Sequence, residues 1–485
     1  MSFIQSPGRS QFMLPSLLDE YVSDDNPVRI IDTFVERLVA NTPPEHGKGG
    51  KGTGRPAYKF STLLKIYLYG YLNSVTSSRR LERECLRNLE VIWLTENLHP
   101  DHKTISDFRR DHKEDIRRCA LSFRRFLKET GYMDGGSVVT DGTKVKAYAS
   151  RDTLSLSAVN QRLERMEAEL DRYLSQLDES DRSETFDEHL ATLADDLGVE
   201  SALLEKIAGL QARVAELEKH RRFMEEHGVD EYAPSDPEAR VMKTRQGFMP
   251  AYNVQMTVDT KHHLIAQMDV TDHPNDFDDL QPNVSSLKEV GIEPSEVLAD
   301  AGYANEEQGR ALEGQGVSVY VPFPESGQER KDGKAGLHFA YDEAHDRFVC
   351  PEGRHLVPVQ RNCLKRGKKY DKYQCGECEG CPRRDACTSS RKGRIIYRRQ
   401  DGQWLADYKA RMKSKTFKEK LGERKKYVEH PFGTIKYRMG QIPLLLRGRE
   451  KVQAEIDLHA TCYNLKRLLH ADNRRNFLSK VLCWG

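Results

Sequence analysis

The chain has 485 residues and a formal net charge of +1, and 31% of its residues are charged while 38% are hydrophobic. No apolar run approaches the roughly 18 residues that a membrane-spanning helix needs, and the first residues lack the apolar core of a signal peptide. These features exclude a membrane protein, and we expect a cytoplasmic protein built from several structural units.

Charge is distributed unevenly along the chain. Residues 160–240 contain 22 acidic and 10 basic residues, a local net charge of −12, which leaves the rest of the chain at +13. A basic body is typical of a protein that binds a phosphate backbone. Solvated charge on a soluble protein is the alternative interpretation.

Helical spacing dominates residues 1–135. Apolar residues recur every three or four positions in YVSDDNPVRIIDTFVERLVA, in STLLKIYLYGYLNSV and in two later segments. The last segment carries a row of basic residues that begins with Arg109 and Arg110. Together with the turn at His99 and Pro100, it favours a helix-turn-helix pair, and we predict a helical DNA-binding domain. A helical bundle with a solvated basic face is the alternative.

Strand patterns begin at Ser137. A β-branched run precedes Asp141 in VVTDGTKVKAYA, and a short apolar run precedes Asp300 in EVLADAGYA. Strands, then a helix, then further strands predict an α/β sheet over residues 136–154 and 239–325. An acid at the end of a buried strand lies at the sheet edge where ligands and metals bind, although most such Asp residues are turn or cap residues.

An acidic insertion, residues 155–238, interrupts this sheet. Apolar residues follow a heptad spacing over residues 203–224, and a second seam runs over residues 163–177. These seams predict two helices that form an antiparallel hairpin or a dimer contact. The role that we expect for them is structural.

A second insertion, residues 326–415, contains six of the ten cysteines. Short spacings between cysteines in an intracellular protein are typical of zinc, which prefers thiolate ligands. We expect a structural zinc ion, and an iron–sulfur cluster is the alternative. The predicted zinc ligands are Cys350, Cys378, Cys381 and Cys387, with Cys375 as their rival and Cys363 as a weaker candidate.

The remaining part, residues 416–485, is predicted to be helical. Glu429 and Lys436 stand seven residues apart, so both lie on one helix face about 10 Å apart. Carboxylates on three separate elements, Asp141, Asp300 and Glu429, form a hard-oxygen site suited to two Mg²⁺ or Mn²⁺ ions. In this arrangement Asp141 would bridge both ions, Asp300 would hold one and Glu429 the other.

The segments PDHKTISDFRRDH, VVTDGTKVKAYAS, LADAGYANEE and VEHPFGTIK, with the Cys-rich segment, resemble the DDE transposases of bacterial insertion sequences. The resemblance implies an α/β fold: a ribonuclease-H-like mixed sheet with flanking helices, preceded by an all-α N-terminal domain and interrupted by the two insertions. It implies an enzyme that uses divalent metal, cleaves double-stranded DNA at element ends and joins the freed 3′-hydroxyl to target DNA. It also implies at least a homodimer on DNA, and a nucleoid-associated location.

A related family pattern places a Tyr and an Arg before the catalytic Glu and a Lys after it. Here Glu429 and Lys436 fit, but Gly422 stands at the Tyr position and Lys425 at the Arg position, with Arg424 adjacent. The resemblance implies that Lys436 contacts a DNA phosphate. Lys425 or Arg424 supplies the other charge, although a lysine cannot make the bidentate contact of an arginine.

Two other functions share these features. One is a non-catalytic DNA-binding regulator descended from a transposase. The other is a metal-dependent nuclease that cuts DNA but does not join it. Cleavage and strand-transfer assays distinguish all three.

Overall fold

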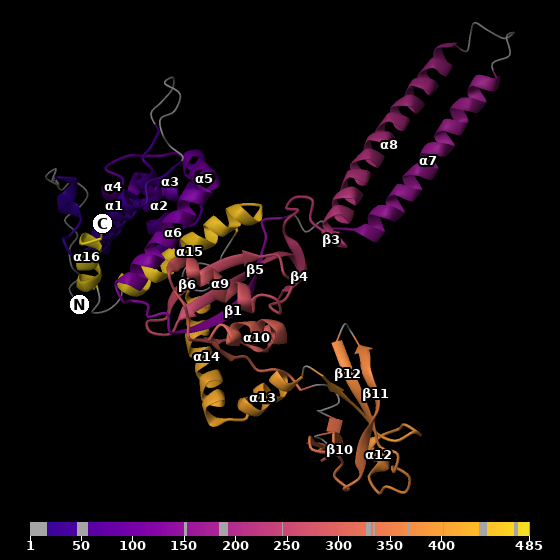
Figure 1. Cartoon of the computed structure of the whole chain (residues 1–485). Coiled ribbons are helices and arrows are strands. Elements are labelled where there is room, and N and C mark those ends of the chain that lie inside the picture. Colours follow the sequence, from indigo (N-terminus) through magenta and orange to yellow (C-terminus); the bar gives the residue numbers. More distant parts are fainter. Residues whose placement is uncertain are drawn as a thin grey trace, which may run out of the picture.

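A computed structural model describes most of the chain. The described residues are 17–45, 57–149, 153–183, 193–244, 246–325, 331–332, 335–365, 368–400, 402–435, 444–469 and 474–484. The chain forms a mixed α/β body with a helical N-terminal region, which confirms those two expectations (Figure 1).

The N-terminal region consists of short helices around one buried helix. They are η1 (Leu18–Tyr21), α1 (Pro27–Asn41), α2 (Phe60–Leu72), α3 (Ser78–Arg87), α4 (Leu89–Leu94), α5 (His102–Asp111) and α6 (Lys113–Glu129). Asn26 begins α1 by accepting a hydrogen bond from the Val28 N–H, and Pro27 occupies the first helical turn, where its missing N–H is not needed. Helix α2 is buried from Phe60 to Tyr71, so the other helices pack around it.

The central sheet contains antiparallel and parallel strands. Its strands are β1 (Ser137–Lys146), β4 (Arg240–Thr244), β5 (Gly247–Asp259), β6 (Leu264–Thr271), β7 (Glu296–Leu298) and β8 (Ser318–Tyr320). The long strand β5 pairs antiparallel with β1 on one side, and with β4 and then β6 on the other. Strands β7 and β8 continue the sheet beyond β1, both parallel to it.

Helices from the middle and the end of the chain cover this sheet. They are α9 (Leu280–Ser286), η2 (Leu287–Val290), η3 (Ala301–Tyr303), α10 (Glu306–Gly314), α13 (Gln403–Met412), α14 (Lys415–Gly433), α15 (Arg449–Leu469) and α16 (Arg474–Leu482). Helix α15 is buried from Val452 to Leu465, because it packs against β6 on one side and against α6 and α2 on the other. The N-terminal helices and the sheet therefore share one hydrophobic core.

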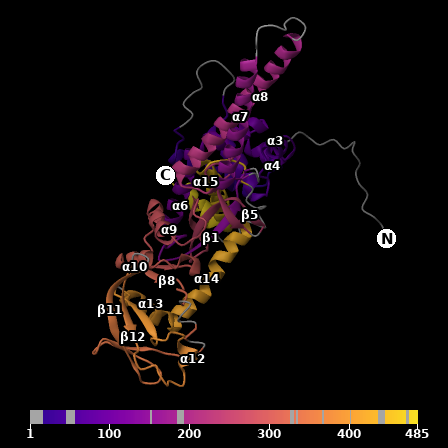
Figure 2. The same ribbon diagram turned by 90° about the vertical axis from the view of Figure 1, so that its right-hand side faces the viewer.

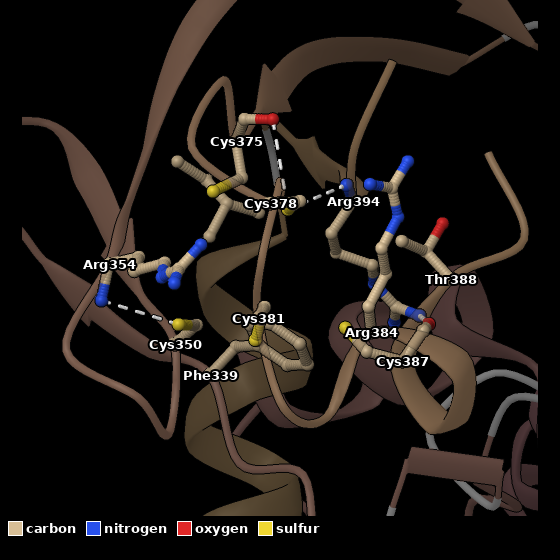
Figure 3. A pocket seen from close by; sticks show the side chains of 11 residues that line it. Phe339, Cys350, Arg354, Cys375, Cys378, Cys381, Arg384, Cys387, Thr388 and Arg394 are labelled. Carbon is tan, nitrogen blue, oxygen red and sulfur yellow. Dashed lines mark hydrogen bonds between the residues drawn. The ribbon is translucent and has the colours of Figure 1, made fainter. Parts of the chain in front are cut away.

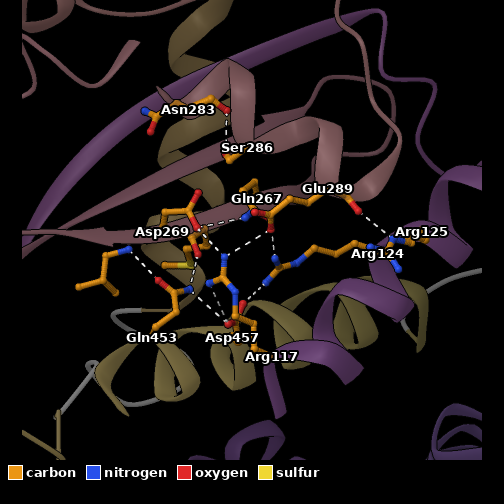
Figure 4. Close-up of polar contacts among 12 residues, drawn as sticks. Arg117, Arg124, Arg125, Gln267, Asp269, Asn283, Ser286, Glu289, Gln453 and Asp457 are labelled. Atoms are coloured by element: carbon orange, nitrogen blue, oxygen red, sulfur yellow. Dashed lines mark hydrogen bonds and ion pairs between the residues drawn. The ribbon is translucent and has the colours of Figure 1, made fainter. Parts of the chain in front are cut away.

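A buried ion pair crosses this shared core (Figure 4). The Arg124 side chain on α6 donates hydrogen bonds to Gln267 of β6, at 2.6 Å, and to Asp457 of α15. Arg124 is 1% exposed and Asp457 is fully buried. A buried charge without its partner is strongly unfavourable, so this pair fixes α6 in one position on the sheet.

Two segments project from the body (Figures 1 and 2). Helices α7 (Leu156–Ser183) and α8 (Leu193–His227) form an antiparallel hairpin whose base is closed by β2 (Leu154–Ser155) and β3 (Glu231–Tyr232). A separate apolar cluster holds that base: Val159, Leu163, Met224 and Tyr232.

The second projecting segment is a small antiparallel sheet that carries the clustered cysteines. Its elements are β9 (Ala340–Asp342), β10 (Arg347–Val349), β11 (His355–Lys365), β12 (Lys368–Gln374), α12 (Arg384–Cys387) and β13 (Ile395–Arg399). The strand order is β13-β12-β11-β10-β9. Within the described residues, no helix has both the length and the apolar character needed to cross a membrane.

Candidate active site

Two neighbouring parallel strands bring Asp141 and Asp300 side by side. Asp300 follows the end of β7 as predicted, but Asp141 was predicted at a strand end and lies within β1, because β1 continues its pairing with β5 as far as Lys146. Val139 of β1 is paired with Leu298 of β7, and each acid stands two residues beyond that pair. Asp300 also caps the short helix η3, because its Oδ1 accepts a hydrogen bond from the Gly302 N–H at 2.7 Å. The parallel pairing explains how acids 159 positions apart in the sequence become neighbours.

A third carboxylate, that of Asp276, approaches the glycines that follow these two acids closely, Gly142 and Gly302. Its Oδ1 would be only 2.2 Å from a Cβ atom placed on Gly142, and its Oδ2 would be 3.5 Å from a Cβ atom on Gly302. A side chain at Gly142 would meet Asp276, and a side chain at Gly302 would meet both Asp300 and Asp276. The sequence analysis did not identify Asp276. A signal for it exists, since an acid follows the β6 strand pattern within a few residues.

Burial, more than the neighbouring charges, changes the protonation of Asp141. Burial raises the pKa of Asp141 to about 6, the Arg424 guanidinium opposes this rise, and the charges of Asp300 and Asp276 add to it. The nearest guanidinium nitrogen of Arg424 is 3.7 Å from Asp141 Oδ2. Arg424 thus faces the acidic edge of the sheet from α14.

The other predicted residues of this region lie on or after α14. Glu429 follows Val428, which is 1% exposed. The side chain of Glu429 lies outside the described part, and so does the whole of Lys436. Their predicted roles therefore stay predictions. Lys425 is exposed on α14 beside Arg424.

Arg109 does not have the position that a DNA contact requires. Its side chain is 3% exposed, pairs with Glu455 at 2.9 Å and donates a hydrogen bond to the Tyr71 hydroxyl at 3.1 Å. Burial against α15 leaves this guanidinium no access to DNA in this structure. Arg110, by contrast, is half-exposed and pairs with Asp107 and Asp111.

The acidic edge fits a hard divalent cation in its chemistry. Carboxylate oxygens are the ligands that Mg²⁺ and Mn²⁺ prefer. Among the side chains that the structure describes, no three His, Cys, Asp or Glu side chains are arranged closely enough to hold an ion.

Five cysteines line one small cavity of about 20 Å³ in the projecting sheet (Figure 3). They are Cys350, Cys375, Cys378, Cys381 and Cys387. The sulfur of Cys350 accepts a hydrogen bond from the Arg354 N–H at 3.3 Å, and the sulfur of Cys378 accepts one from the Arg394 N–H at 3.4 Å. N–H donors of this kind stabilise thiolate sulfur. Cys363, on β11, does not line the cavity.

Local packing distinguishes one of the five. Cys375 is 1% exposed and belongs to an apolar cluster with Leu356 and Tyr373. Burial raises the pKa of Cys375 to about 11, and it also raises the pKa of Cys387, so burial rather than protonation sets Cys375 apart. Gly393 adopts a φ of +86°, and a Cβ there would be 2.1 Å from the Cys375 carbonyl oxygen. This turn needs glycine, and it carries the Arg394 N–H to Cys378.

Comparisons with known proteins agree with the resemblance. A family model described as a transposase DDE domain matches residues 349–469, a stretch that contains Glu429 but neither Asp141 nor Asp300. A second model, described as a transposase domain, matches residues 16–111. No curated protein matches the chain.

One match among solved structures is the cryo-EM structure of the piggyBac transposase synaptic complex with hairpin DNA. It has 8% sequence identity and a TM-score of 0.25, and it covers 94% of this chain and 84% of that chain. A similarity this low supports no argument about the fold. The two family matches cover the N-terminal helices and the Cys-rich and C-terminal parts of the chain, and both describe domains of transposases.

Proposed function

We propose that the protein is an insertion-sequence transposase that cleaves double-stranded DNA at the element ends and joins the 3′-hydroxyl to target DNA. The observation that carries this proposal is the position of Asp141 and Asp300. Each acid stands two residues after Val139 or Leu298, and these two residues are paired between the parallel strands β1 and β7. Acids held side by side on or just beyond adjacent parallel strands can share one metal-bound phosphate. We place the reaction at the bacterial nucleoid, where that substrate is found.

The strand arrangement supports a ribonuclease-H-like sheet as part of this proposal. Three antiparallel strands, β6, β5 and β1, are followed by the parallel strands β7 and β8 in the order β6-β5-β1-β7-β8. In the proposed division, the hairpin and the Cys-rich sheet are insertions into this core, and the N-terminal helices form the DNA-binding unit.

Asp141, Asp300 and Glu429 would hold the metal ions. Bound divalent ions supply Lewis-acid stabilisation of the attacking and leaving oxygens during phosphoryl transfer. Asp141 must lose its proton to take part, and its pKa of about 6 means that it is ionised at neutral pH. Arg424 then stands beside the reacting phosphate with a positive charge. Lys425 and Lys436 are the other proposed DNA contacts.

The Cys-rich sheet is proposed to hold a structural zinc ion through Cys350, Cys378, Cys381 and Cys387. These four line one cavity, and Cys375 is accounted for by its apolar cluster. Metal analysis of the purified protein should find one zinc ion per chain. Cys378→Ser should lose it, whereas Cys363→Ser, outside the cavity, should retain it. Iron in place of zinc would favour an iron–sulfur cluster.

DNA cleavage tests the main proposal. With Mg²⁺, the wild-type protein should cut DNA that carries the element ends and join a pre-cut 3′ end to target DNA. Asp141→Asn and Asp300→Asn should abolish both reactions, and Glu293→Gln, an exposed acid outside the site, should retain both. Cutting without joining would indicate a nuclease. DNA binding without cutting would indicate a regulator.

We further propose that the active form is a homodimer, because two element ends must be held together for joining. Sedimentation in the presence of end-bearing DNA should give two chains per complex. One chain per complex under conditions that support joining would contradict this.

A further inference from the structure

We propose that the outer face of the Cys-rich sheet binds single-stranded DNA by stacking unpaired bases on two tyrosines. The outer face is the side of β11, β12 and β13 that is turned away from the cavity that the cysteines line. This inference goes beyond the proposed cleavage and joining, which take place at the central sheet.

Pairing between β12 and β13 divides their side chains between two faces. Side chains at paired positions of antiparallel strands lie on the same face, and successive residues alternate between faces. Tyr373 pairs with Ile396, is fully buried and belongs to the apolar cluster beside the cysteines. The next pair along the strands, Lys372 with Tyr397, therefore lies on the outer face. Tyr397 is 40% exposed there.

A second tyrosine lies on the outer face beside this pair. Tyr370 stands two residues before Lys372 on β12, and it is partly exposed. Its position is diagonal to that of Tyr397 across β12 and β13. Diagonal neighbours in a sheet are about 7–8 Å apart, within the reach of aromatic side chains. Two tyrosines and a lysine thus share one open surface.

Charge around the outer face suits a polyanion. Residues 355–399 contain 13 basic and 4 acidic residues, a net charge of +9. Arg391 and Lys392 are exposed in the turn before β13. Gln374, on the outer face, donates a hydrogen bond from its Nε2 to the Lys392 carbonyl oxygen at 2.5 Å. This bond holds the basic turn beside the tyrosines, where it can contact phosphates while the bases stack.

Exposed rings favour a single strand over a duplex. In a duplex the faces of the bases are covered by their neighbours, whereas an unpaired base offers its face to an aromatic side chain. Stacking of this kind tolerates any base, so we expect binding without sequence preference. The Cys-rich sheet projects from the body (Figure 1), which gives a strand access to it.

Binding of a fluorescein-labelled oligo-dT to the full chain, measured by fluorescence anisotropy, tests this proposal. Tyr397→Ala should weaken binding about tenfold, because it removes one stacking ring, and Tyr397→Phe should retain binding. Tyr173→Ala, on the acidic hairpin, is the matched control and should bind like the wild type. Lys372→Gln should reduce the dependence of log affinity on log salt concentration by about 0.7, the value for one phosphate contact to a single strand.

Photocrosslinking provides a readout that a loss of stability cannot imitate. Oligo-dT that carries iodouracil should crosslink to Tyr397 or Tyr370 in the wild type. Unchanged affinity in Tyr397→Ala, or crosslinks confined to the body, would overturn the inference.

Two other outcomes would also overturn it. Equal affinity for a dA–dT duplex that also depends on Tyr397 would indicate docking on the phosphate backbone. A change of oligomeric state in Tyr397→Ala, with unchanged oligo-dT binding, would indicate that a second copy of the chain covers this face. Oligo-dT binding by a protein that cuts no DNA would instead refute the proposed function and leave this inference in place.

Discussion

Replacement of Asp141 by Asn should stabilise the metal-free protein while abolishing its chemistry. The pKa of Asp141 is about 6 instead of 3.8, and each pKa unit corresponds to about 1.4 kcal/mol. The ionised carboxylate therefore destabilises the folded state by up to about 3 kcal/mol. Because 27% of the side chain remains exposed, solvent screening reduces the expected gain to about 2 kcal/mol.

The sign and the pH range of this effect follow from the direction of the shift. An acid whose pKa is raised by folding binds its proton more tightly in the folded state, so stability falls as pH rises from 3.8 to about 6 and then stays constant. The gain from Asp141→Asn should be full at pH 8, roughly half as large at pH 5 and absent well below pH 4.

Calorimetric melting in EDTA at pH 5 and pH 8 measures this difference, with Glu293→Gln as the control for loss of a surface charge. Addition of Mn²⁺ should make the wild type more stable than Asp141→Asn, because the ion stabilises only the protein that binds it. An equal gain at both pH values would refute the reasoning, since it would show that the benefit does not come from removing a titrating charge.

The remaining predictions concern packing. Arg109→Ala should lower the free energy of unfolding by about 3–5 kcal/mol, because Glu455 is left buried without its partner; chemical denaturation measures this, and reduced DNA affinity at unchanged stability would contradict the burial. Gly142→Ala should lower the free energy of unfolding, because the added methyl group would stand 2.2 Å from Asp276 Oδ1 and disturb its hydrogen bonds to Asn253 and Gln255; unchanged stability in chemical denaturation would argue against this contact. Replacement of residues 157–230 by a short turn should leave the melting temperature of the body unchanged, since the hairpin has its own apolar cluster; a large decrease would show that the two are coupled.

Local sequence patterns predicted the elements well and their long-range partners poorly. The β-branched run before Asp141 and the turn after Asp300 are local features, so their positions were readable. The continuation of β1 past Asp141 to Lys146 depends on its pairing with β5 and was not. Whether Arg109 faces solvent depends on Glu455, which is 346 positions away in the sequence. A basic helix face has the same spacing whether it meets DNA or buried acids, and only packing distinguishes the two.

The cysteines illustrate the same limit. Their spacing predicted one centre, and five of them do line one cavity. Spacing alone could not separate Cys375 from the others, because its burial depends on Leu356 and Tyr373 from neighbouring strands. Asp276 escaped detection for a related reason, since its relevance depends on the absence of side chains at Gly142 and Gly302.

Strand β5 ties the interior of the molecule to its chemistry through simple alternation. Asn253, Gln255 and Thr257 point their polar groups to one face, while Val254, Met256 and Val258 join the hydrophobic core. A shift of the strand register by one residue would exchange these two sets of side chains between the two faces of the sheet. Apolar side chains would then face the acids, and amide side chains would enter the hydrophobic core. Insertions or deletions should therefore be tolerated in the hairpin and the Cys-rich sheet far more readily than anywhere along this strand.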